Sequence, residues 1–153
     1  MSENTIYELE TFTVKLRDVE NEHYEKKANE PEQVAEIGRK ILDTEDADQE
    51  HFYYFAVDGK NKIKGVKKVS TGTLTSSLIH PREVYKGAIL FGAAALIFLH
   101  NHPSGDTTPS KEDIQITERL MEVGEMVGIS VLDHVIVTRM EDTSSSFQEL
   151  DII

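Results

Sequence analysis

The chain has 153 residues, 39% of them apolar and 29% charged, which predicts a single compact domain with a core of its own. Its 28 acidic residues outnumber the 16 lysines and arginines and give a formal net charge of -12, so direct DNA binding is not expected. Cysteine is absent, which excludes disulfides, thiolate nucleophiles and Cys-ligated zinc and leaves histidines and carboxylates as metal ligands.

The sequence predicts neither a membrane span nor an export signal. The longest apolar stretch, Ala88–Leu99, is shorter than the roughly 20 residues needed to cross a bilayer. The amino terminus carries acidic residues where a secretory signal would carry basic ones. We therefore expect a soluble, cytoplasmic protein with no membrane partner.

The first part of the chain predicts a strand, a connection and a helix. Apolar and polar residues partly alternate over Phe12–Leu16, which indicates a strand, and the polar stretch Asn21–Glu30 after it indicates an exposed connection. We assign residues 1–30 to this strand and connection and residues 31–153 to the domain. A proline suited to a first helical turn and apolar residues at helical spacing predict a helix over Pro31–Leu42.

A hairpin and a second helix are expected in the middle of the chain. The segment Phe52–Val57 is rich in aromatic and β-preferring residues, and an Asp-Gly turn follows it. The second arm, Lys62–Val69, carries lysines that suit the edge of a sheet. A helix is then expected over Pro81–Ala93. Its expected buried residues include Val84, Ala88 and Ile89.

The last third predicts strand, helix and strand. We expect a buried strand over Ala94–Leu99, a helix over Ser110–Val127 and a strand over Ile129–Val137. The apolar residues of this helix that recur at helical spacing are Ile114, Leu120, Val123 and Val127. A short final strand is expected to involve Phe147 and Ile152–Ile153. The order of elements predicts an α/β or α+β domain built around one sheet.

Residues 99–113 (LHNHPSGDTTPSKED) join an apolar strand to a helix and carry an unusual set of polar groups. His100 and His102 are two residues apart, so on a strand both imidazoles project from one face. Asp113 lies in the first turn of the following helix, close enough to supply an oxygen ligand. Two histidines, one carboxylate and an open position are typical of a catalytic zinc site.

The same residues also allow a purely structural interpretation. Ser110 and Asp113 have the spacing of a capping box, and His-x-His before Pro and Gly is often only a strand end and a turn. Ser110 can serve both uses, because it can cap the helix while its hydroxyl reaches into the site.

The sequence HNHPSG at residues 100–105, followed by Ser110 and Asp113, resembles the JAMM signature of MPN-fold (JAB) metalloproteins. Over roughly Pro31–Val137 the chain is similar to the bacterial RadC branch of that superfamily. The resemblance implies an MPN/JAB-like, cytidine-deaminase-like mixed sheet flanked by helices. A full-length RadC protein also has an N-terminal helix-hairpin-helix region, which this sequence lacks, so the resemblance does not support a DNA-related role tied to that region.

The resemblance also implies a set of ligands and a general base. A zinc ion would be held by His100, His102 and Asp113, with a water in the fourth position. In MPN enzymes, a glutamate near the start of the first core strand takes a proton from that water as it attacks a carbonyl carbon. Glu50, immediately before the predicted hairpin, occupies that place.

Other polar residues receive secondary roles. Ser110 would correspond to the serine that polarises the carbonyl or stabilises the oxyanion. Glu83, in the first turn of the second helix, is the alternative base. His80 is interpreted as a helix-boundary residue. One of Asp133 and His134 must point inward, and His134 is interpreted as a structural residue or a support for the metal ligands.

Together, these features predict a zinc-dependent hydrolase of amide or isopeptide bonds, that is, a metallopeptidase acting on a peptide or protein. One alternative is a RadC-type accessory in DNA repair, suggested by the family and by the lysines of residues 60–68. Another is a non-catalytic MPN module that binds a partner. Self-association as a homo-oligomer would be in keeping with the family.

Overall fold

The computed structural model describes residues 28–43, 45, 48–75, 77–140 and 142–153, so the strand expected at Phe12–Leu16 lies outside the described residues. The predicted order of helix, hairpin, helix, strand, helix and strand is confirmed, and a short further strand follows. The elements are α1 (Pro31–Leu42), β1 (His51–Val57), β2 (Ile63–Thr71), α2 (Pro81–Leu90), β3 (Ala95–Asn101), α3 (Lys111–Val127), β4 (Ser130–Val137) and β5 (Ser144–Ser146).

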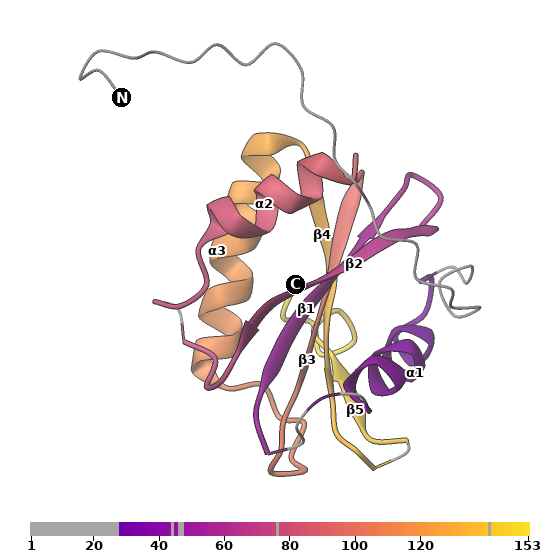
Figure 1. Cartoon of the computed structure of the whole chain (residues 1–153), viewed down its shortest axis with the longest axis vertical. Helices are drawn as coiled ribbons and strands as arrows, with labels where there is room; N and C mark the ends of the chain where they lie inside the picture. The colour runs from indigo at the N-terminus through magenta and orange to yellow at the C-terminus, as the bar shows by residue number, and fades with distance from the viewer. Residues whose placement is uncertain (1–27, 44, 46–47, 76, 141) are drawn as a thin grey trace, which may run out of the picture.

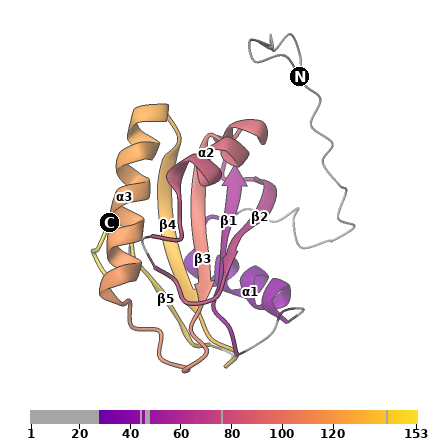
Figure 2. The same ribbon diagram turned by 60° about the vertical axis from the view of Figure 1, so that its left-hand side comes forward.

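The strands form one mixed sheet in the order β2-β1-β3-β4-β5. β3 and β4 are parallel and the other neighbouring pairs are antiparallel. A parallel pair needs a crossover connection, and α3 supplies it. Helix α1 covers one face of the sheet, while α2 and α3 cover the other (Figures 1 and 2). The structure therefore confirms the expected α/β class, with the lysine-bearing β2 at an edge. None of the described helices is long and apolar enough to span a membrane.

Side chains of β1 and β3 contribute to two separate hydrophobic cores, one on each face of the sheet. Every residue of β1 and β3 is buried, and successive side chains of a strand point to opposite faces. The core beneath α1 includes Tyr53, Phe55, Ile97 and Leu99. The core beneath α2 and α3 includes Phe52, Tyr54, Leu96 and Phe98. His100 follows Phe98 by two residues, so the strand directs its imidazole to the face covered by α3.

The expected boundaries around α2 and β3 are partly wrong. α2 ends at Leu90 rather than Ala93, and Gly92 adopts a left-handed φ of 63° that terminates the helical path. Ile89 is 59% exposed rather than buried. β3 continues past Leu99 to Asn101 because its pairing with β1 extends to His100 and its pairing with β4 to Asn101, and this carries His100 into the sheet.

α3 begins after Ser110 and ends at Gly128, whose φ of 76° provides a left-handed cap. Its buried face differs from the expected one, since Val127 is 45% exposed. The residues buried on this helix are Asp113, Ile116, Thr117, Leu120 and Gly124. A Cβ atom on Gly124 would lie 2.5 Å from the Tyr85 hydroxyl, so the close approach of α2 at this glycine selects the buried face.

The final strand lies earlier than predicted. It is formed by Ser144–Ser146, which pair with the end of β4. Phe147 is buried beyond the strand, where its ring stacks on His134 with the centroids 4.5 Å apart. The buried Asp133 carboxylate fixes this arrangement by accepting hydrogen bonds from the Ser146 hydroxyl at 2.6 Å and the Gln148 N–H at 3.1 Å. A run of serines thus becomes a strand through side-chain bonds rather than through apolar burial.

Candidate metal centre

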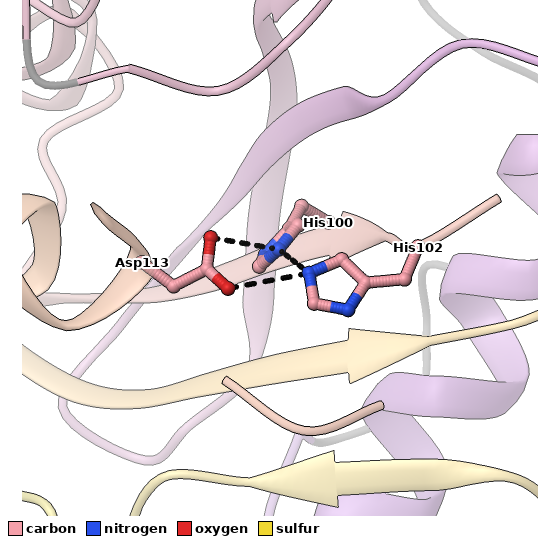
Figure 3. A group of neighbouring side chains, drawn as sticks. All are labelled: His100, His102 and Asp113. Carbon is pink, nitrogen blue, oxygen red and sulfur yellow. Dashed lines mark hydrogen bonds and ion pairs between the residues drawn. The ribbon is translucent and has the colours of Figure 1, made fainter. Parts of the chain in front are cut away.

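Three side chains from the end of β3 and the start of α3 converge on one point (Figure 3). The Nε2 atoms of His100 and His102 lie 2.8 Å apart. The Asp113 oxygens Oδ1 and Oδ2 lie 3.3 Å and 3.2 Å from the Nε2 atoms of His100 and His102, respectively. One ligand atom from each residue lies within 4.8 Å of the others. The structure therefore brings together the three residues that the sequence singled out, in a group that can hold a metal ion.

The loop after β3 fixes the orientation of His102. Its backbone N–H donates to the Val137 carbonyl at 3.0 Å. A tight turn follows, with Gly105 in the left-handed region at φ 84°. This turn returns the Asp106 carbonyl to within 2.6 Å of His102 Nδ1. A carbonyl oxygen can only accept, so Nδ1 carries the hydrogen and Nε2 presents its lone pair to the centre.

The charges of the site favour a cation at its centre. Burial lowers the pKa of His100. Burial alone would raise the pKa of Asp113, but the adjacent His100 and His102 rings outweigh it and hold that pKa below its usual range. Burial would lower the pKa of His102, yet the Asp113 carboxylate and the Asp106 carbonyl raise it overall. An ionised carboxylate facing imidazole nitrogens is the mixed N/O donor set that zinc accepts.

The structural interpretation of Ser110 and Asp113 is also confirmed. The Ser110 N–H donates to Asp113 Oδ2 at 2.7 Å, and the Asp113 N–H donates to Ser110 Oγ at 3.1 Å. The same Oδ2 atom faces His102, so the capping box holds the carboxylate in place for the metal site. The Ser110 oxygen accepts the capping bond, so its hydroxyl hydrogen is not used by the capping box.

Glu50 lies just before β1. Its backbone carbonyl accepts from the Gly72 N–H at 2.8 Å, and its Oε2 atom accepts from the Leu74 N–H at 2.7 Å. Burial is the largest effect on the pKa of both histidines, and Asp113 acts on both more strongly than Glu50 does. The negative charge of Glu50 makes a smaller contribution that acts to raise each pKa, although the pKa of His100 remains lowered overall. The carboxylate is therefore anchored by one oxygen within electrostatic reach of both imidazoles.

Asn101 is a residue of the site that sequence reasoning missed. Its side chain donates from Nδ2 to the Gln49 carbonyl at 2.9 Å and accepts at Oδ1 from the His51 N–H at 2.7 Å. These bonds hold the backbone on both sides of Glu50. Its position between the two histidine ligands was the available signal, but the chain segment that it binds lies about 50 positions earlier.

The remaining sequence candidates lie elsewhere or act indirectly. Glu83 sits on the exposed surface of α2, where its carboxylate pairs with Lys86 at 3.1 Å. His80 is the N-cap residue of α2, as interpreted from the sequence. His134 is fully buried, and its Nε2 atom lies 2.7 Å from His100 Nδ1. Burial, followed by the charge of His100, lowers the pKa of His134 well below its usual value.

A cleft of about 1030 Å³ borders the site on the α1 side of the sheet. It lies between α1, the loop after β3 and the connection from β4 to β5. His102 is the one residue of the three-ligand group that lines it, together with the neighbouring Asn101. The cleft therefore meets the metal centre at its edge, and His100 remains enclosed beneath α3.

Comparison with known proteins agrees with this geometry. Residues 28–152 match the family model described as the RadC-like JAB domain. The chain belongs to this family. The RadC resemblance and the JAB-type fold expected from the sequence are thereby confirmed.

Several UPF0758 proteins are similar to this RadC-like chain. The one from Desulforudis audaxviator is 53% identical over 103 residues, which cover 67% of this chain and 45% of the relative. The one from Desulforamulus reducens is 49% identical over 114 residues, or 74% and 49% of the two chains. The one from Staphylococcus haemolyticus is 50% identical over 111 residues, or 72% and 48%. The chain thus spans about half the length of these curated relatives.

Proposed function

We propose that this RadC-like JAB domain is a zinc-dependent hydrolase of amide bonds, acting as a peptidase or isopeptidase. The observation that carries the proposal is the convergence of two imidazole nitrogens and the Asp113 carboxylate on one point. The charge of Glu50 acts on both imidazoles. A three-ligand set of this kind leaves a coordination position open, as catalytic zinc sites do. The JAB family assignment supports the same reading.

In the proposed hydrolysis, each residue around the centre has a separate chemical role. Zinc bound there would supply Lewis-acid chemistry, lowering the pKa of a coordinated water and polarising the scissile carbonyl. Glu50, held through Oε2 by the Leu74 N–H, takes the water's proton on its other oxygen and passes it to the leaving nitrogen. The Ser110 hydroxyl donates to the oxygen that becomes negative in the transition state. The capping box keeps that hydroxyl and the Asp113 carboxylate at a fixed separation.

The alternative functions have weaker support. Within the lysine cluster that suggested a DNA-repair accessory, Lys68 is paired with Glu45 at 2.9 Å. The net charge of -12 opposes the approach of phosphates. A non-catalytic binding module has no need for converging metal ligands.

Metal content of the untagged protein tests the site first. Wild type should carry about one zinc per chain, and both His102→Ala and Asp113→Ala should lose it. Glu112→Ala is the matched control and should keep the metal, because it removes an exposed carboxylate from the same helical turn as Asp113 but outside the three-residue group. If wild type binds no zinc even after reconstitution, the hydrolase proposal fails and the binding-module alternative takes its place.

Turnover tests the reaction itself. Zinc-loaded protein is incubated in ¹⁸O-labelled water with a casein-derived peptide mixture and with lysine isopeptides, and mass spectrometry detects labelled new carboxyl groups. Glu50→Gln should keep its zinc and lose turnover by roughly 10²- to 10⁴-fold, the usual contribution of a general base. A Glu50→Gln protein that is as active as wild type would remove Glu50 from the mechanism.

A further inference from the structure

We propose that Thr117 and His134 act as positioning residues that fix the tautomer of His100 and thereby set the affinity of the centre for zinc. The affinity part of this inference rests on the proposed zinc site. The proton assignment concerns the protein alone and can be tested separately.

The environment of His134 keeps its ring neutral. Its side chain is completely buried, and Phe147 stacks on it with ring centroids 4.5 Å apart. Phe52 and Phe98 contact it edge-on, at 5.5 Å and 5.9 Å between centroids. A charged imidazolium enclosed by three phenyl rings would lose its hydration without a compensating partner. A neutral ring has one nitrogen that donates and one that accepts.

The Thr117 hydroxyl decides which nitrogen of His134 donates. Its Oγ1 atom lies 2.7 Å from the Asp113 backbone carbonyl, which can only accept, so the hydroxyl hydrogen is committed there. The same oxygen lies 2.7 Å from His134 Nδ1 and can act toward it only as an acceptor. The hydrogen of His134 is therefore on Nδ1, and its Nε2 atom carries the lone pair.

That lone pair in turn decides the tautomer of His100. His134 Nε2 lies 2.7 Å from His100 Nδ1, so His100 Nδ1 must donate. The lone pair of His100 is thereby left on Nε2, which faces the centre beside Asp113 Oδ1. The Nδ1 atom of His102 is likewise held as a donor, by the Asp106 carbonyl. When zinc displaces any hydrogen on His102 Nε2, both imidazoles can therefore bind the metal through Nε2.

The chain of hydrogen bonds closes on the third ligand. It runs from His100 on β3 through His134 on β4 and Thr117 on α3 to the backbone of Asp113. Without the Thr117 hydroxyl, His134 could move its hydrogen to Nε2 and donate it to His100. The hydrogen of His100 would then move to Nε2 and block the atom that binds the metal.

Zinc affinity tests the consequence, by competition with a chromophoric chelator. Thr117→Val should weaken zinc binding roughly 10- to 100-fold, the usual effect of losing a group that orients a metal-binding histidine. Thr117→Ser, which keeps the hydroxyl, should restore near wild-type affinity. Thr138→Val is the matched control: it also removes a buried hydroxyl, but one that accepts from the Met140 N–H, and it should leave affinity unchanged.

Imidazole ¹⁵N NMR of the metal-free protein tests the proton assignment, both in the wild type and in Thr117→Val. Wild type should show the hydrogen on Nδ1 in His100 and in His134, and Thr117→Val should change both. A wild-type His100 with its hydrogen on Nε2 would overturn the inference, as would wild-type zinc affinity in Thr117→Val. A wild type that binds no zinc would instead refute the proposed function and the affinity claim, while the spectrum would still decide the tautomers.

Discussion

Removing the Asp133 carboxylate should detach the C-terminal segment from β4 and destabilise the domain. Its oxygens accept from the Ser146 hydroxyl at 2.6 Å, the His134 N–H at 2.7 Å and the Gln148 N–H at 3.1 Å. Asp133→Ala leaves these three donors without their acceptor, and a buried donor left unsatisfied costs about 1 to 3 kcal/mol. Because Gln148 is exposed and water can replace its acceptor, we expect a loss of about 3 to 5 kcal/mol rather than three full penalties. That is a large share of the roughly 5 to 15 kcal/mol that stabilises a typical domain.

Urea unfolding of the metal-free protein measures this loss directly. Asp133→Asn is the matched control, since it keeps one acceptor oxygen and the side-chain volume, and it should lose about 1 kcal/mol. Hydrogen exchange should locate the damage in Asp133→Ala, with faster exchange at the Phe147 N–H, which donates to the His134 carbonyl at 3.0 Å. If Asp133→Ala unfolds within about 1 kcal/mol of wild type, the carboxylate is not what holds β5, and the account of this strand is wrong.

Three further predictions concern the site. Gly105→Val places a β-branched residue at φ 84° and should lower the free energy of unfolding by about 1 to 3 kcal/mol. It should also weaken zinc binding, because it displaces the Asp106 carbonyl that orients His102. Unchanged affinity in a chelator competition would contradict this. Asn101→Leu breaks both bonds that flank Glu50, so amide exchange at the start of β1 should quicken while the zinc content stays at the wild-type level, and loss of the metal would contradict that separation. Zinc at 100 times the wild-type Kd should stabilise wild type by about 2.7 kcal/mol and should stabilise Asp113→Asn by far less. The rise in Tm on adding zinc measures this difference. Equal rises in the two proteins would mean that the metal binds elsewhere.

Local signals in the sequence were sufficient for the order of elements and for the His100, His102 and Asp113 group that can hold a metal. Prolines in the first turn began α1 and α2, and Ser110 with Gly128 bounded α3. The group could be predicted because His100 lies near the end of β3, His102 follows directly after the strand, and Asp113 is in the first turn of the next helix. Over so short a span, the periods of strand and helix alone bring the three side chains together.

Only the tertiary structure decided which residues support those ligands. Thr117 and His134 are recognisable as a hydrogen-bonded pair only once α3 packs on β4, and Asn101 meets the residues around Glu50 only when β1 pairs with β3. Local spacing also mispredicted β5 and the buried face of α3. These features depend on contacts between segments far apart in the chain, where the burial of polar groups and the close approach of backbones outweigh local preference. The sequence by itself thus determined which three side chains come together, and the packing of the sheet against α3 determined how they are oriented.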